Sequence, residues 1–429
     1  MRGRDEGLRQ WLRAEFLEVE QDIGPGVVTG AADDDPSGIA TYSQSGAQFG
    51  YALLWTVPLT YPLLAAVQLV SAHIGRVTGA GFAKALNRAL PHPIVSLLVT
   101  ILLVANIFNI GADLTAMAAA TQLIFGGGRH VLVVVFALAC VLLQVFMPYR
   151  RYAKVLKWLT LSLFAYVGVV LLIHVDWPAA LRGLVWPSNL GRDALLTVVA
   201  VFGTTISPYL LFWQSDQEAE EMANAGQRPL KRAPRSVKKQ YRRIRIDTLL
   251  GIAFAHFIAL AIMLATAATL HAKGLTNIRS AAEAAEALRP IAGRFASLLF
   301  AIGIIGTGLL AIPVLAGSAG FAVAETHGWK SGLEYKPQQA ARFYTIIAGA
   351  IFVGVALDWS NLNPIRALFW SAVLNGLTAV PLMAAMMIIA SSSRIMGHLH
   401  ESRAILFFGW AATAVMGIAS AAMMVSSVN

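Results

Sequence analysis

The sequence predicts an all-α polytopic membrane protein that crosses the bilayer about eleven times. Of its 429 residues, 57% are hydrophobic and only 13% are charged, and the mean hydropathy is +0.64. A soluble domain carries about 25% charged residues, so most of this surface is expected to avoid water. Several apolar runs also reach the roughly 20 residues that a helix needs to span a bilayer.

The expected spans follow from these apolar runs and from the polar segments that separate them. They cover residues 26–48, 51–74, 93–124, 130–147, 155–175, 194–214, 246–271, 293–323, 342–358, 364–391 and 403–426. The segment 1–23 is charged and amphipathic and lacks the apolar stretch of a signal peptide, so we expect it to remain cytoplasmic. The transmembrane domain then covers 24–426.

The positive charge supports this topology. The net charge is +10, and with a cytoplasmic N-terminus most Lys and Arg residues fall on the inner side, which leaves the C-terminus outside. The largest basic run, residues 228–245, is a short loop between spans and offers no folded face for a nucleic acid. We therefore expect the lipid bilayer as the partner, in a plasma (inner) membrane, and no nucleic acid. The residue pattern does not specify an oligomeric state.

Several classes of site are excluded. The single cysteine, Cys140, lies in an apolar run, which rules out a disulfide framework and a cysteine metal cluster. The histidines show no HExxH spacing, and no nucleophile–base pattern is present. The glycines of 303–308 follow no strand and are typical of helix packing rather than of a nucleotide loop. The sequence therefore does not predict an enzyme, a catalytic residue or a cofactor.

Two of the expected spans are interrupted by small residues and a proline. They are Gly24–Gly50, which contains Pro36, and Val198–Asp216, which contains Pro208. Interrupted helices in corresponding positions of two halves indicate a transporter site near the bilayer midplane. The interrupted spans open successive sets of five, which predicts inverted repeats. We expect repeat one at about 24–175, repeat two at about 194–391, and an extra helix at about 403–426.

Asp33, Asp34 and Asp35 lie inside the first span. An ionised aspartate at mid-bilayer costs roughly 3 kcal/mol, so three in a row need compensation. A helix broken at residues 36–38 frees backbone carbonyls, and these oxygens together with carboxylates form a shell suited to Mg²⁺, Ca²⁺ or Mn²⁺. The alternative is that the aspartates lie at the membrane interface and cap a half-helix.

Other polar residues within spans are less specific. Thr204, Thr205 and Ser207 flank the second break, but hydroxyls within spans mostly bond back to their own helix. These hydroxyls indicate a binding site only in combination with the first interrupted span. Asp113 is a further acid within a span, and it either relays protons or pairs with a neighbouring helix.

The residues at both breaks resemble a known family. Asp35-Pro36-Ser37-Gly38, Ser207-Pro208-Tyr209 and the stretches 24–26, 71–79 and 301–320 are similar to the natural resistance-associated macrophage protein (Nramp) family of divalent metal transporters. The resemblance spans nearly the whole chain. It implies a LeuT-type fold of two inverted five-helix repeats plus an eleventh helix, with metal bound between the first and sixth helices.

Carried over by position, the resemblance implies that the metal ligands are Asp35, the carbonyls of Ala32 and Thr204, and Ser207. Gly38 stands where the family has a coordinating asparagine, so it marks a vacated ligand position.

Around these ligands, Asp33 and Asp34 add negative potential and hold an outer hydration shell. Tyr209 and Gln214 stand where the family has two histidines.

These departures carry the functional prediction. The family's methionine is replaced by Ser207, and losing sulfur relaxes discrimination against hard ions such as Mg²⁺. Two missing side-chain ligands leave room for a partly hydrated ion. Tyr209 does not titrate near neutrality, and the family's acidic proton path falls on Ile107 and Ile110. The chain thus looks like the Nramp-related magnesium transporter branch.

We therefore expect import of Mg²⁺ and Mn²⁺, as substrates and not as cofactors, without obligatory proton coupling. One alternative is a proton-coupled Mn²⁺/Fe²⁺ symporter of the Nramp type that uses Asp113. Another is a sodium-coupled organic solute carrier, against which the three adjacent aspartates argue. A channel on the same scaffold is a further alternative.

Overall fold

The structure is a computed structural model that describes residues 26, 29–30, 33–147, 161–188, 191–233, 236–360, 362–399 and 401–428. Every regular element within these ranges is a helix. The predicted cytoplasmic segment 1–23 and the predicted ligand Ala32 lie outside the described residues.

Long helices form most of the molecule. They are α4 (Thr56–Thr78), α6 (His92–Phe125), α7 (Arg129–Phe146), α13 (Val237–Thr269), α16 (Ala296–Thr326), α18 (Pro364–Ala390) and α20 (Arg403–Val428). Helices of intermediate length are α3 (Pro36–Phe49), α9 (Phe164–Leu172), α11 (Arg192–Thr205), α12 (Pro208–Asn224) and α17 (Ala341–Val355).

Short helices connect them. They are α5 (Phe82–Ala89), α10 (Trp177–Val185), α14 (Ala281–Ala285), α15 (Arg289–Ala292) and α19 (Ser393–Met396). The 3-10 turns are η1 (Leu161–Leu163), η2 (Leu230–Arg232), η4 (His271–Lys273), η5 (Glu286–Leu288), η6 (Gly293–Phe295) and η7 (Ala356–Ser360).

Within the described ranges, nine helical stretches are long and apolar enough to cross a membrane. They correspond to the second, third, fourth and sixth to eleventh predicted spans. The first predicted span contains α3, and the fifth contains the shorter apolar helix Leu161–Leu172. Both of these predicted spans also include residues outside the described ranges.

Two predicted spans begin well away from the residue at which the corresponding helix begins in the structure. The range 51–74 becomes helical only at Thr56, because Gly50 ends α3 with φ at 57° and residues 51–55 turn the chain back. The range 246–271 belongs to a helix that already begins at Val237. Lys and Arg are good helix formers, so this helix continues through a basic stretch that hydropathy alone excludes.

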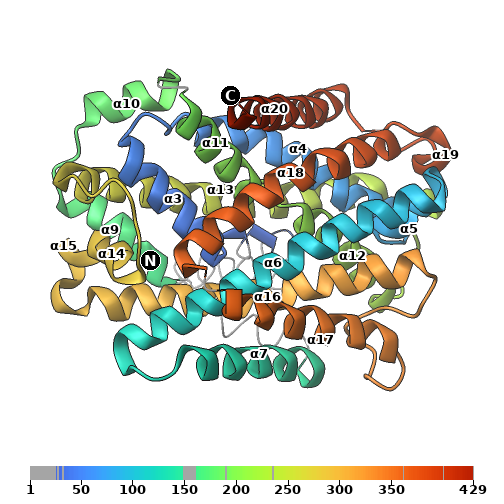
Figure 1. The fold of residues 1–429 in the computed structure, drawn as a ribbon. Coiled ribbons are helices and arrows are strands. Elements are labelled where there is room, and N and C mark those ends of the chain that lie inside the picture. The colour runs from blue at the N-terminus through green and yellow to red at the C-terminus, as the bar shows by residue number, and fades with distance from the viewer. Residues whose placement is uncertain are drawn as a thin grey trace, which may run out of the picture.

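The interrupted helices α3, α11 and α12 pack among the long helices of the bundle. In Figure 1, α6 and α16 run side by side through the centre, and α7 and α17 pack along their lower edge. The helix α3 packs against α13, α18 and α11, whereas α12 packs against α4 and α16. Close approach uses small residues: a Cβ added to Gly203 of α11 would collide with the backbone of Ala372 and Gly376 on α18.

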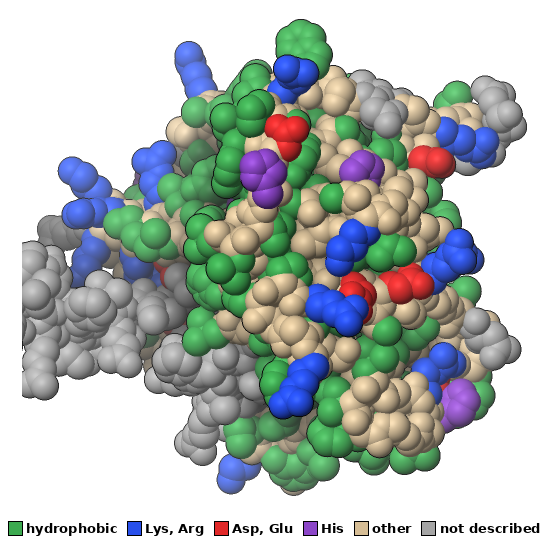
Figure 2. Space-filling view, turned by 90° about the vertical axis from the view of Figure 1, so that its left-hand side faces the viewer, with side chains coloured by type: hydrophobic (Ala, Val, Ile, Leu, Met, Phe, Trp, Pro, Cys, Tyr) green, Lys and Arg blue, Asp and Glu red, His purple; other side chains and the backbone are tan. Residues whose placement is uncertain are grey.

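The sides and one end of the bundle differ in chemistry. Along α7, the side chains of Val131, Val135, Leu138 and Leu142 are exposed, and contiguous apolar exposure of this kind fits lipid rather than water. Figure 2 views the end at which α10, α14 and α15 lie, at the left of Figure 1, and shows charged and histidine side chains spread across it. The helices therefore run from this polar end along apolar sides.

Candidate metal-binding site

Two helix breaks meet in the interior of the bundle. The helix α3 begins at Pro36 after Asp35, whose backbone is extended (φ −71°, ψ 170°). The helix α11 ends at Thr205, and α12 begins at Pro208 after Ser207, which is also extended (φ −72°, ψ 129°). Proline lacks an N–H and disfavours the helical conformation of the residue before it, so each break coincides with a proline of the sequence.

Asp35 is 1% exposed and uses its two carboxylate oxygens differently. Its Oδ1 accepts hydrogen bonds from Ser37 Oγ at 2.6 Å and from the backbone N–H of Gly38 at 2.8 Å, which caps α3. Its Oδ2 accepts a hydrogen bond from Asn109 Nδ2 on α6 at 3.1 Å. A carboxylate oxygen has two lone pairs, so Oδ2 can still bind a cation.

Hydroxyl groups join the two breaks. Ser37 Oγ lies 3.3 Å from Thr204 Oγ1, and Tyr42 Oη lies 2.9 Å from Thr205 Oγ1. The carbonyl of Thr204 has no helical N–H partner four residues on, because that residue is a proline. Ser207 Oγ donates to this carbonyl at 2.8 Å and to that of Gly203 at 3.0 Å. The Thr204 carbonyl oxygen and Ser207 Oγ each keep a lone pair that can bind an ion.

Gly38 lies opposite the second break. A Cβ added to this glycine would be 3.2 Å from Thr204 Oγ1 and 3.6 Å from the carbonyl oxygen of Asp33. A longer side chain at position 38 would therefore enter the space between the two breaks, which in this chain is left to smaller groups.

Further acidic groups surround this space. Asp33 and Asp34 are 2% and 3% exposed, and one oxygen of each has no hydrogen-bond partner among the described residues. Both oxygens of Asp113, which is fully buried on α6, also lack such a partner there. Asp113 is one helical turn from Asn109, which contacts Asp35, and one turn from Met117, which lies beside Gly308, as Pro36 does. Buried carboxylates without partners favour a cation.

Comparison with known protein families places nearly all of the chain in one family. Residues 26–426 match the model of the family described as natural resistance-associated macrophage protein-like. The chain belongs to the Nramp family. The predicted resemblance is thereby confirmed at the level of the family.

Relatives of this Nramp protein cover nearly all of it. A divalent metal cation transporter MntH of Klebsiella pneumoniae is 27% identical over 412 residues, which are 92% of this chain and 91% of the relative. A transporter of the same name from Yersinia pestis is 26% identical over 395 residues, 90% of each chain.

Solved structures share the fold. A manganese transporter of Eremococcus coleocola superposes with a TM-score of 0.73 at 17% identity, covering 94% of this chain and 86% of that one. A Na⁺-coupled sialic acid symporter superposes with a TM-score of 0.59 at 12% identity, covering 95% and 90%. The prediction of a LeuT-type fold with two inverted repeats and an eleventh helix is confirmed.

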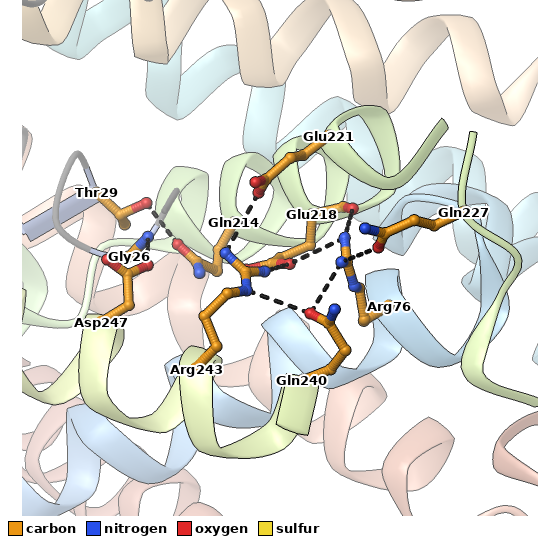
Figure 3. A network of polar contacts seen from close by, with 10 residues as sticks. All are labelled: Gly26, Thr29, Arg76, Gln214, Glu218, Glu221, Gln227, Gln240, Arg243 and Asp247. Atoms are coloured by element: carbon orange, nitrogen blue, oxygen red, sulfur yellow. Dashed lines mark hydrogen bonds and ion pairs between the residues drawn. The ribbon is translucent and has the colours of Figure 1, made fainter. Parts of the chain in front are cut away.

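Two other predicted site residues of this Nramp chain, Tyr209 and Gln214, lie on α12 beyond the second break. Tyr209 follows Pro208 and is fully buried. Gln214 lies further along α12, and its Oε1 accepts a hydrogen bond from Thr29 Oγ1 at 2.5 Å. Gln214 thus contacts the segment before the first break, and it belongs to the polar network of Figure 3 rather than to the space beside Asp35.

That network joins α4, α12 and α13 at the end of the bundle opposite α10. Glu218, which is fully buried, pairs with Arg243 at 2.6 Å and with Arg76 at 3.8 Å. Arg76 also donates to Gln227 at 2.5 Å and to Gln240 at 2.9 Å (Figure 3). The network therefore connects α4 and α13 to α12, which is the second half of the interrupted α11–α12 pair.

Sequence reasoning missed two residues beside Asp35. The sequence pattern identifies Ser37 only as part of the helix break, although its hydroxyl contacts both Asp35 and Thr204. The pattern does not assign Asn109 to the site. A signal for Asn109 was present, because Asn109 and Asp113 are four residues apart and lie on one face of a predicted helix.

Proposed function

We propose that this chain is a secondary transporter that imports divalent metal ions, with Mg²⁺ and Mn²⁺ favoured, and without obligatory proton coupling. The observation that carries the proposal is the set of carboxylate, hydroxyl and carbonyl oxygens of Asp35, Thr204 and Ser207 at two facing helix breaks. The similarity to proteins named as divalent metal cation and manganese transporters supports the ion class.

The ion would be held by one carboxylate and by backbone and hydroxyl oxygens. Asp35, the Thr204 carbonyl and Ser207 provide such oxygens near the breaks. The family resemblance adds the carbonyl of Ala32 as a further proposed ligand, and this residue lies outside the described ranges. No three His, Cys, Asp or Glu side chains in the described part of the chain form a metal cluster. Oxygen ligands without sulfur favour hard cations.

The proposal includes room for water on the ion. Gly38 presents no side chain to the space beside Thr204, and Ser207 is shorter than any thioether. Mg²⁺ gives up its water reluctantly and usually keeps several water ligands. A roomy oxygen site with extra negative charge from Asp33 and Asp34 therefore suits a partly hydrated ion.

Access from one end is supported by a cavity of about 230 Å³. Its lining includes Gln44 and Gln48 of α3, Asp193 of α11 and Arg366 of α18. At the opposite end, the Arg76–Glu218–Arg243 pairs hold α4, α12 and α13 together. With the N-terminus in the cytoplasm, as the basic residues indicate, the cavity lies on the outer side and the network on the inner side.

The same topology assigns the parts of the chain. Residues 1–23 form a cytoplasmic segment, and 24–426 form the transporter in the plasma membrane. Repeat one covers about 24–175, repeat two about 194–391, and the extra helix about 403–426, which leaves the C-terminus outside.

Metal uptake into proteoliposomes with an internal pH dye tests the function. We expect Mg²⁺ and Mn²⁺ to enter without acidification of the lumen. Entry of Mn²⁺ alone, accompanied by acidification, would contradict both the ion preference and the absence of coupling.

The structure favours one second candidate, a proton-coupled Mn²⁺/Fe²⁺ symporter. Asp113 is buried one turn from Asn109, and its oxygens lack hydrogen-bond partners among the described residues. A carboxyl in this position is suited to take up a proton. Acidification that follows Mn²⁺ entry and disappears in Asp113→Asn would establish this alternative.

A further inference from the structure

Only one of the two polar atoms of the Asn109 side-chain amide has a hydrogen-bond partner among the described residues. Its Nδ2 donates to Asp35 Oδ2 at 3.1 Å, whereas its Oδ1 is buried and has no hydrogen-bond partner among the described residues. The opposite orientation of the amide would set Oδ1 against the carboxylate, so Asp35 determines which way the group points. An unpaired buried carbonyl oxygen is destabilising unless something binds it.

The unpaired oxygen is within reach of an ion bound to Asp35. The oxygen and nitrogen of an amide are about 2.2 Å apart, so Asn109 Oδ1 lies at most roughly 5.3 Å from Asp35 Oδ2. Two oxygens that share a hard cation lie about 3–4 Å apart, because each is roughly 2.1 Å from the metal. The upper limit of roughly 5.3 Å therefore permits Asn109 Oδ1 and Asp35 Oδ2 to bind the same cation. The neighbouring carboxylate of Asp113 cannot donate a hydrogen bond to Asn109 Oδ1 while Asp113 is ionised.

We propose that Asn109 is a ligand of the transported ion, which its Oδ1 binds directly beside Asp35 Oδ2. This inference rests on the proposed function for the position of the ion. Asn109 lies on α6, whereas Asp35, Thr204 and Ser207 lie at the breaks of the interrupted helices. The bound ion therefore connects the interrupted helices to α6, which packs centrally against α16 and α18.

A purely positioning role for Asn109 makes a different prediction. If only the hydrogen bond from Nδ2 to Asp35 matters, both Asn109→Ala and Asn109→Asp lose it, and Asp adds repulsion. If Oδ1 binds the ion, Asn109→Asp keeps an oxygen in place and replaces a neutral ligand by a charged one.

The test is divalent metal binding to purified full-length protein, measured by calorimetry with Mn²⁺ and with Mg²⁺. We expect Asn109→Ala to weaken binding at least tenfold and Asn109→Asp to stay within threefold of wild type or to bind more tightly. Asn109→Asp binding as weakly as Asn109→Ala, or Asn109→Ala binding like wild type, would overturn the proposal.

Asn106 supplies matched controls on the same helix. It is fully buried, and its Nδ2 donates to the Leu315 carbonyl and to Ser318 Oγ on α16, both at 2.9 Å. Asn106→Ala should bind metal within twofold of wild type. Asn106→Asp adds a buried charge without adding a ligand, so tighter binding in this variant equal to that of Asn109→Asp would count against direct ligation.

A spectroscopic measurement tests the contact without relying on a substitution. In Mn²⁺-loaded protein with ¹³C at the asparagine side-chain carbonyls, electron–nuclear double resonance should detect a carbon about 3 Å from the ion. This signal should be absent from Asn109→Asp and present in Asn106→Ala. Bound Mn²⁺ without the signal overturns the inference alone, whereas a wild type that binds neither ion overturns the proposed function.

Discussion

Replacing Asp35 by Asn tests the proposed site most directly. Asn is as good an N-cap as Asp, so its Oδ1 can still accept from Ser37 Oγ and from the Gly38 N–H. Its amide nitrogen replaces Oδ2, the oxygen that Asn109 contacts and that we assign to the ion. The variant therefore removes the charge and the ligand while the start of α3 is retained.

The magnitude follows from the charge that is lost. At about 3 Å, the distance from a directly bound ion to the centre of a carboxylate, two unit charges interact by about 5.5 kcal/mol at an effective dielectric constant of about 20. A divalent ion doubles this to about 11 kcal/mol. The desolvation of both groups offsets much of the attraction, so we expect a net loss of about 3 kcal/mol, which is roughly a hundredfold weaker binding.

Calorimetric binding and liposome uptake measure this loss, with Asp216→Asn as the matched control. Asp216 is 3% exposed, and its carboxylate oxygens lack hydrogen-bond partners among the described residues, as those of Asp113 do. It lies nine residues beyond Ser207 on α12, about 13.5 Å along the helix. Asp216→Asn should bind within threefold of wild type. Unchanged binding and uptake in Asp35→Asn would refute the site assignment.

Three further predictions concern other parts of the molecule. Ser207→Met places a soft thioether at the second break and should shift preference from Mg²⁺ toward Mn²⁺ in competition uptake; an unchanged ratio would mean that position 207 does not face the ion. Asp113→Asn removes a buried charge near Asp35 and should weaken Mn²⁺ uptake severalfold without changing lumenal pH, which the internal dye reports. Glu218→Ala leaves Arg243 without its buried partner and should destabilise the protein by about 3–5 kcal/mol, seen as a lower Tm in detergent. Glu221→Ala, which removes a more exposed partner 3.5 Å from Arg243, should cost less than about 1 kcal/mol; equal losses would show that burial does not set the effect.

The sequence was sufficient for the features that depend on local composition. Apolar runs long enough to span a bilayer determine where the helices lie, because lipid forces every backbone polar group to pair within its own segment. Pro36 and Pro208 likewise determine where two helices are interrupted, since a missing N–H is a local property. The helix limits were less predictable where basic residues extend a helix beyond the apolar run, as at Val237.

Only the tertiary structure decided which polar groups share the interior. Asn109 Nδ2 meets Asp35 across 74 residues of sequence, and Ser37 meets Thr204 across 167. Helical periodicity places Asn109 and Asp113 on one face of α6, but the same periodicity permits that face to meet any neighbouring helix. The choice depends on which helices can approach closely, as α11 and α18 do through Gly203 and Gly376. For this reason the sequence by itself identified the acidic break, and the packing of the helices assembled the groups around it.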